Sequence, residues 1–268
     1  MIDAHVHLWR IGRSECVWPT PADGVLHRDY MLAELLATLD EAAIDRAVLV
    51  QSQESPLDTA WLLEIAASTG RIAGVVGWAD LSDSDAVSDL AAHGALRGLR
   101  PMVQDRAADW YDDPAFDAGF AAMIDKRLVL DALVRPTHLA ALDRLAVRHP
   151  GLVIVIDHAA KPRGDDVGLA GWRAAIAPLG RHPNVHVKLS GLLTELPGEA
   201  VGPAVAALLD VFGADRLLWG SDWPVVTAVS GLREWRDLVS ALIPQGEHHA
   251  VFGGNAAGVY RIAETGYA

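Results

Sequence analysis

Short apolar runs recur along the 268-residue chain and alternate with longer amphipathic stretches, and this alternation limits the fold more than any other feature. Runs such as RAVLV at 46–50 and LVIVI at 152–156 are almost continuously apolar. Such runs are typical of strands covered on both faces in a parallel sheet. We expect strands to start near eight positions: Ile2, Asp45, Arg71, Arg97, Arg127, Gly151, Asn184 and Asp215.

The stretches between these runs carry apolar residues at helical spacing. They predict helices over 31–42, 57–68, 85–95, 114–125, 137–149, 168–180, 199–212 and 232–243, and a C-terminal helix at 254–264 that we expect on the outside. Eight β–α units in a chain of this length are typical of one (β/α)8 TIM barrel, here a single domain over 1–268. An open doubly wound sheet is the alternative, but no glycine-rich dinucleotide fingerprint follows an early strand.

A long connection follows the first predicted strand. Residues 9–30 contain two Trp and two Pro and show no clear periodicity. A long loop at the ligand-bearing end of a barrel often forms a lid or a wall of the site. A plain surface loop is the alternative.

Charge and composition restrict the partners. The net charge is −13, which argues against nucleic acid or an anionic membrane as partner but not against a small anionic ligand. Cys16 is the one cysteine, so no disulfide framework forms within the chain. We find no leader peptide and no apolar run of membrane-spanning length, and we expect a cytoplasmic enzyme. Both a monomer and a homo-oligomer remain open.

Polar residues gather at the predicted strand ends. His5 and His7 are two residues apart on the first strand and project to one face, which Asp3 is expected to share. His158 follows the sixth strand, and Asp222 lies at the tip of the eighth. Imidazoles with a carboxylate at a barrel mouth can hold a metal, and such a carboxylate can also act as a general base. A helix cap or turn role for Asp222, and a structural role for His158, are the alternatives.

Other polar side chains are candidates for substrate contacts, and each has a structural alternative. Lys188 shares a face with His186 on the seventh strand, and if that face is inward, Lys188 lies near the mouth and His186 one layer deeper. The alternative is a lysine that extends along the rim. Arg100 precedes Pro101 after the fourth strand and offers a rigid guanidinium or a structural salt bridge. The remaining candidates are Gln53, Lys161, Arg10 and Trp110, of which Trp110 could equally be a packing residue.

These segments together resemble the amidohydrolase superfamily, and most closely its amidohydrolase 2 branch of TIM-barrel lactone hydrolases. That branch includes L-fuconolactonases, L-rhamnonolactonases and 2-pyrone-4,6-dicarboxylate lactonases. The resemblance rests on IDAHVHLWR (2–10), VQSQ (50–53), TAWLLEIA (59–66), GVVGWADL (74–81), GLRPMVQD (98–105), VIDHAAKP (155–162), VKLSGL (187–192) and LLWGSDWPV (217–225).

The resemblance implies a site at the C-terminal mouth of the barrel. His5 and His7 match the strand-1 pair of the family, His158 the strand-6 histidine and Asp222 the strand-8 carboxylate. A binuclear centre in the wider superfamily usually needs a lysine on strand 4 or 5. Here neither strand has one, and strand 5 offers Asp131 instead. We therefore expect one divalent metal, with zinc the best match to these ligands, or no metal at all.

The reaction that this resemblance implies is the opening of a small lactone, most simply a sugar lactone. Asp222 would take a proton from water and return it to the leaving alkoxide, and His158 and Lys188 would stabilise the oxyanion if no metal is bound. The alternatives are a lactonase for a dicarboxylate or muconolactone, a metal-dependent decarboxylase, and a non-catalytic binder. The missing strand-5 histidine argues against the decarboxylase.

Overall fold

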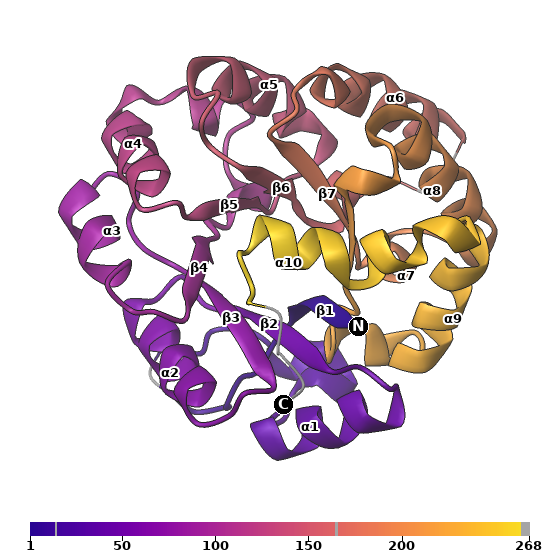
Figure 1. The fold of residues 1–268 in the computed structure, drawn as a ribbon, viewed down its shortest axis with the longest axis horizontal. Coiled ribbons are helices and arrows are strands. Elements are labelled where there is room, and N and C mark those ends of the chain that lie inside the picture. The colour runs from indigo at the N-terminus through magenta and orange to yellow at the C-terminus, as the bar shows by residue number, and fades with distance from the viewer. Residues whose placement is uncertain (14, 164–165, 264–268) are drawn as a thin grey trace.

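The computed structural model describes residues 1–13, 15–163 and 166–263. Eight strands form one sheet, and each pairs in parallel with the next in chain order (Figure 1). They are β1 (Ile2–Val6), β2 (Arg46–Val50), β3 (Ile72–Gly77), β4 (Leu96–Leu99), β5 (Val129–Ala132), β6 (Ile154–Ile156), β7 (Val185–Leu189) and β8 (Leu217–Trp219). The segment after β8 pairs with β1, since the amide of His7 donates to the carbonyl of Trp223 at 2.7 Å. The predicted (β/α)8 TIM barrel is confirmed.

Helices surround the barrel close to where the periodicity predicts them (Figure 1). They are α1 (Leu32–Glu41), α2 (Pro56–Ala67), α3 (Ser84–Leu90), α4 (Asp117–Asp125), α5 (Leu139–Arg148), α6 (Asp166–Ile176), α7 (Leu192–Glu195), α8 (Gly198–Phe212), α9 (Leu232–Leu242) and α10 (Asn255–Val259). In α5, Leu139, Leu142 and Leu145 are fully buried, and each contributes about 1.5–3 kcal/mol by leaving water. Among the described residues, no helix combines the length and the apolarity that crossing a membrane requires.

The C-terminal segment covers the N-terminal end of the barrel. We expected a helix over 254–264 on the outside of the fold, but α10 is shorter, and Glu264 lies outside the described residues. Figure 1 shows α10 crossing the end of the barrel rather than joining the outer ring of helices. Tyr260 and Ile262, which follow α10, belong to the apolar cluster inside the barrel. This segment therefore closes the end opposite the predicted site.

A register shift interrupts β1 between Asp3 and Val6. Strict alternation from His5 would turn Ile2 and Ala4 toward the helices, but both join the apolar cluster inside the barrel. The carboxylate of Asp3 does not join the site, because its Oδ1 accepts hydrogen bonds from the backbone amides of His5 and Ser221. An irregularity of this kind changes the side-chain alternation of a strand. It allows His5 and His7 to point inward above an apolar layer.

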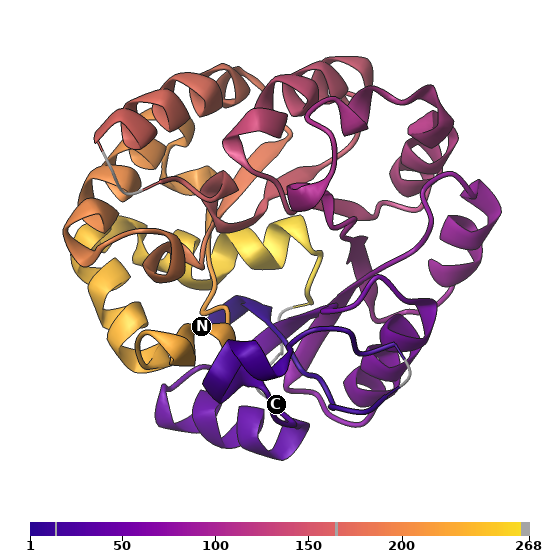
Figure 2. The same ribbon diagram turned by 180° about the vertical axis from the view of Figure 1, so that it is seen from behind.

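The long connection after β1 lies over the opposite end of the barrel, as Figure 2 shows. A backbone pair between Trp9 and Tyr30 joins its two ends, and a 3-10 helix spans Pro21–Leu26. Trp18 lines the cavity described below, so this connection forms part of the wall of that cavity. Ser14, within the same predicted loop, lies outside the described residues.

Candidate active site

A cavity of about 160 Å³ lies at the C-terminal ends of the strands. It contains His7, His158, Asp222, Arg100 and Lys161, which the sequence pointed to. The other lining residues are Trp18, Ser52, Met102, Gln104, Leu133 and Val225. TIM-barrel enzymes carry their active sites at this end of the barrel.

Three side chains converge at the floor of this cavity. The Nε2 atoms of His5 and His7 lie 3.0 Å apart, and Oδ1 of Asp222 lies 3.3 Å from Nε2 of His7 and 3.7 Å from Nε2 of His5. Nδ1 of His7 donates to the carbonyl of Val50 at 2.8 Å, so the lone pair of the neutral ring is on Nε2. Two imidazole nitrogens and one carboxylate oxygen therefore face a common point.

Asp222 is buried, and its Oδ1 has no hydrogen-bond donor. Its backbone has a φ of 60°, a left-handed conformation that a non-glycine residue adopts at a cost of about 1–3 kcal/mol. Burial alone would raise the pKa of this carboxyl, but the imidazoles of His158, His7 and His5 outweigh burial and hold the pKa well below its ordinary value. Asp222 is thus ionised at neutral pH and able to bind a cation or accept a proton.

His158 lies beside this group on a left-handed turn after β6, with a φ of 51°. Its Nδ1 lies 2.9 Å from Oγ of Ser190, and its ring packs against the ring of His5 with centroids 4.6 Å apart. Burial lowers the pKa of His158 to about 4, so the ring is neutral at pH 7. His158 can therefore offer a hydrogen bond in the cavity but no charge.

Lys188 does not line the cavity, contrary to the expectation that it binds substrate. Its ammonium group is fully buried beneath His5, where it contacts Asp131, lies 3.0 Å from Oδ1 of Asp157 and lies 3.1 Å from Nδ1 of His5. The side chain points into the barrel because residues of β7 alternate between its two faces. Sequence position gave the correct face, but it placed Lys188 one layer too high.

Arg100 and Lys161 do line the cavity, and both already have anionic partners. Nη1 of Arg100 lies 3.5 Å from Oδ2 of Asp157, and its Nη2 donates to the carbonyl of Gln51. Nζ of Lys161 donates to Oε1 of Glu195 at 3.0 Å. The substrate-facing cations are therefore largely neutralised by the protein itself.

The other three predicted contacts lie outside the cavity lining. Gln53 holds the long loop, because its Nε2 donates to the carbonyl of Trp18 and its Oε1 accepts from the amide of Val17. Arg10 is exposed and lies 3.9 Å from Asp29. Trp110 stacks on Phe116, with ring centroids 4.2 Å apart. Packing, the alternative considered for Trp110, is what the structure shows.

Several cavity residues escaped sequence reasoning. Gln104 carries a buried Oε1 without a donor, and Met102, Leu133 and Val225 supply apolar surface. Ser52 directly precedes Gln53, and the sequence predicts a substrate contact for Gln53 but none for Ser52. The segments VQSQ and GLRPMVQD contain Ser52, Met102 and Gln104, so the resemblance marked their region without assigning them roles.

Two groups of buried side chains have the spacing of metal ligands in the described part of the chain, and they share His5. The first is His5, Asp157 and His158, but Asp157 is engaged by Lys188 and Arg100. The second is His5, His7 and Asp222, in which Oδ1 of Asp222 has no donor. The second group is the better candidate because no protein cation competes for its carboxylate oxygen.

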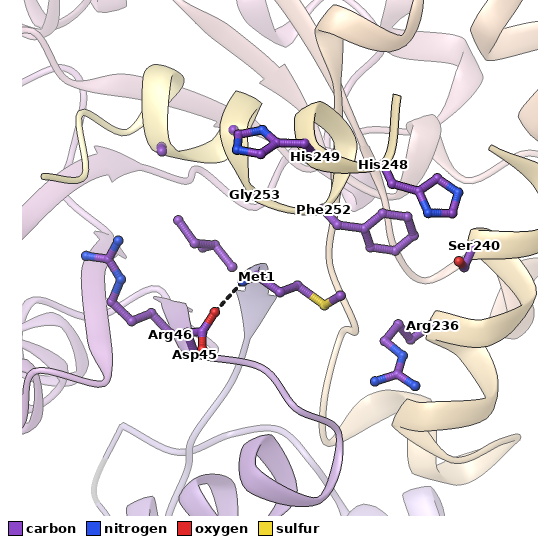
Figure 3. A pocket seen from close by; sticks show the side chains of 12 residues that line it. Met1, Asp45, Arg46, Arg236, Ser240, His248, His249, Phe252 and Gly253 are labelled. Carbon is purple, nitrogen blue, oxygen red and sulfur yellow. Dashed lines mark hydrogen bonds and ion pairs between the residues drawn. The ribbon is translucent and has the colours of Figure 1, made fainter. Parts of the chain in front are cut away.

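A larger cavity, of about 650 Å³, opens at the other end of the barrel. Figure 3 shows Arg46, Arg236, His248 and Phe252 around it, with an ion pair between Met1 and Asp45. Its arginines are occupied, because Arg46 donates to the carbonyl of Ala263 and Arg236 to that of Ala42. None of the predicted catalytic residues lies there, so the smaller cavity is the candidate site despite its size.

Comparisons with known proteins identify the family of the chain. The family described as Amidohydrolase matches residues 2–262. An L-fucono-1,5-lactonase from Burkholderia ambifaria is 41% identical over 276 residues, which cover 97% of this chain and 95% of that protein. A second L-fucono-1,5-lactonase, from Burkholderia multivorans, is 35% identical and covers 98% of this chain and 96% of its own. A crystal structure of an amidohydrolase from Burkholderia multivorans with bound zinc matches with a TM-score of 0.92 and 35% identity, over 98% of this chain and 99% of that one.

Proposed function

The chain belongs to the amidohydrolase family, and on this premise we propose that it is a hydrolase that opens a sugar lactone. The observation that carries the proposal is the cavity floor. Two imidazole Nε2 atoms and an ionised carboxylate oxygen without a donor face one point there, beneath walls that carry hydroxyl-binding groups. The L-fucono-1,5-lactonases at 41% and 35% identity support a substrate of this class.

His5, His7 and Asp222 fit one divalent metal. The donor set of two imidazoles and a carboxylate suits zinc, and the buried Oδ1 of Asp222 lacks any other partner. Bound zinc lowers the pKa of water to about 7 and polarises a carbonyl group.

The reaction needs one proton to move twice. Asp222 accepts a proton from the attacking water, the new C–O bond forms at the lactone carbonyl, and the ring C–O bond breaks. Asp222 then returns the proton to the departing ring oxygen, so that water and lactone give one hydroxy acid. We assign the hydroxyl of Ser190 as donor to Nδ1 of His158, which leaves a proton on Nε2 for the carbonyl oxygen.

The cavity favours a neutral polyhydroxy lactone over a dicarboxylate. Arg100 and Lys161 each have a protein carboxylate as partner, so two substrate carboxylates would find little uncompensated charge among the described residues. Gln104 and Ser52 instead match hydroxyl groups, since the unpartnered Oε1 of Gln104 accepts a hydrogen bond. The apolar side of the cavity suits the carbon skeleton of a sugar.

Proton release in weak buffer tests the proposal, with L-fucono-1,5-lactone, other aldonolactones and 2-pyrone-4,6-dicarboxylate as substrates. Spontaneous hydrolysis without enzyme is subtracted. We expect turnover of aldonolactones, with kcat lowered about 10²- to 10⁴-fold in Asp222→Asn at an unchanged melting temperature. Turnover confined to the dicarboxylate, or Asp222→Asn keeping a tenth of the wild-type rate, would overturn the substrate class or the role of Asp222. Carbon dioxide release from a carboxylic acid panel would indicate decarboxylation instead.

A further inference from the structure

A chain of buried polar groups connects the two ends of the barrel. The hydroxyl of Tyr260 donates to Asp131, lying 2.8 Å from Oδ1 and 3.0 Å from Oδ2. Asp131 contacts the ammonium of Lys188, which lies 3.1 Å from Nδ1 of His5. All four residues are fully buried. The chain therefore runs from the segment after α10 to the imidazole pair at the cavity floor.

Tyr260 is the unusual member of this chain, because it belongs to none of the eight β–α units. It follows α10, which covers the opposite end of the barrel, and it enters the apolar cluster formed by Val48, Val129 and Leu218. Burying a hydroxyl and a lysine–carboxylate pair in an apolar layer costs free energy unless all are hydrogen-bonded. Lactone opening as described above uses neither Tyr260 nor Asp131.

The ammonium of Lys188 lies between two carboxylates, because it donates to Oδ2 of Asp131 and lies 3.0 Å from Oδ1 of Asp157. A histidine that binds a metal through Nε2 carries its proton on Nδ1, and a carboxylate commonly accepts that proton's hydrogen bond. Oδ1 of Asp157 lies 3.4 Å from Nδ1 of His5 and has no other donor among the described residues. Lys188 holds Asp157 beside His5, and the ring of His5 is then fixed with Nε2 toward His7 and Asp222. Tyr260 holds Asp131, so it fixes the far end of the same set of contacts.

We propose that Tyr260 is a positioning residue that acts through Asp131 and Lys188 to orient His5 for metal binding. This inference rests on the proposed function for its catalytic consequence. The orientation of His5 itself does not depend on that function. The C-terminal segment thus serves the site at the other end of the barrel and does more than cover the hydrophobic core.

Tyr260→Phe tests the proposal, and Tyr111→Phe is its matched control. Tyr111 is equally buried, but its hydroxyl has no hydrogen-bond partner among the described residues, so its removal breaks no contact. Zinc affinity is measured by competition with a chelating dye, and kcat and KM by lactone turnover. We expect about tenfold weaker zinc binding in Tyr260→Phe, the size seen for partners of metal-ligating histidines, and no such change in Tyr111→Phe.

Turnover should show the same pattern, with kcat about tenfold lower and KM changed by less than about twofold in Tyr260→Phe. Equal zinc affinity and equal kcat in the two variants would overturn the proposal. A lower melting temperature for Tyr260→Phe without a change in either quantity would also overturn it, since Tyr260 would then be structural only.

Asp131→Asn gives a second route to the same conclusion if Tyr260→Phe folds poorly. It keeps the shape of the side chain but removes the charge that Lys188 contacts, and we expect zinc affinity to fall at least as far. The imidazole ¹⁵N resonances of His5 in metal-free protein provide a readout that needs neither zinc nor lactone. Unchanged His5 resonances in both variants would refute the positioning role, whereas a shift without any lactonase activity would refute only the proposed function.

Discussion

Gly191→Ala should damage the site far more than it damages the fold. Gly191 has a φ of 62°, and a Cβ added there would lie 2.6 Å from Nδ1 of His158. Ordinary contact begins at 3.4 Å, so His158 has to move by about 0.8 Å. A displacement near 1 Å at a catalytic group costs about 100-fold in rate, and we expect kcat to fall about 10- to 100-fold. The left-handed backbone costs a further 1–2 kcal/mol or so of stability, about 2–8 °C in melting temperature.

Gly24→Ala is the control for placing an alanine at a positive φ without a steric clash. Its φ is 58° with a ψ of −116°, against 62° and 4° at Gly191, so the backbone strain at Gly24 is at least as large. An added Cβ at Gly24 would have no neighbour within 4 Å. Steady-state lactone turnover and thermal melts are measured for both variants. If the loss of kcat in Gly191→Ala is within about twofold of that in Gly24→Ala, displacement of His158 is not the cause, and its assigned role in catalysis is refuted.

Three further substitutions test other parts of the structure. Burial and the charge of Arg216 lower the pKa of His186 to about 4, below its unfolded value of 6.5, so the unfolded chain binds the proton first and stability falls as pH drops from 6.5 to 4. In His186→Gln, the free energy of unfolding should fall by about 1–3 kcal/mol less between pH 7.5 and pH 5 than in the wild type, as measured by urea unfolding. An equal fall in the two proteins would contradict the lowered pKa of His186. Gln53→Ala frees the loop at Trp18 and should raise KM by up to about 30-fold, because two hydrogen bonds of about 1 kcal/mol each are lost. Trp110→Leu should lower stability by about 0.5–1.5 kcal/mol through its lost stacking on Phe116 while KM stays constant, and a raised KM would restore Trp110 as a substrate contact.

The core of the site could be predicted because parallel strands of a barrel end at one mouth. His7, His158 and Asp222 come at or just after the ends of β1, β6 and β8, which lie far apart in the sequence. The closed barrel brings all three together with His5, at the contacts described above. Their chemistry follows from residue type, and their proximity follows from the fold class.

The distance of a side chain from the barrel mouth could not be predicted. Alternation along a strand shows which face a residue lies on, but not how far it lies below the mouth. Lys188 was placed near the mouth, yet it lies under His5 with two carboxylates around it. The register shift in β1 has no signature in a sequence of five residues, and it moved Asp3 away from the site. Trp18 reaches the cavity because Gln53 donates a hydrogen bond to its carbonyl. The two residues are 35 positions apart, and neither residue type by itself predicts this contact.

The charges at the cavity floor explain why a cation suits this site. Lys188 and Arg100 face the carboxylates of Asp131, Asp157 and Asp222, which leaves one negative charge in excess when all are ionised. Burial raises the pKa of Asp131 only to about 6 against the charge of Lys188, so that carboxylate remains mostly ionised at pH 7.5. Lactone opening develops negative charge on the carbonyl oxygen, and a negative floor would oppose it. A divalent cation between His5, His7 and Asp222 would change the balance from −1 to +1.

Dialysis against a chelator should therefore lower kcat by orders of magnitude, and added zinc should restore kcat. The melting temperature of the dialysed protein should show that it is still folded. Full activity after complete zinc removal, verified by elemental analysis, would refute the metal requirement and leave His158 as the donor to the oxyanion.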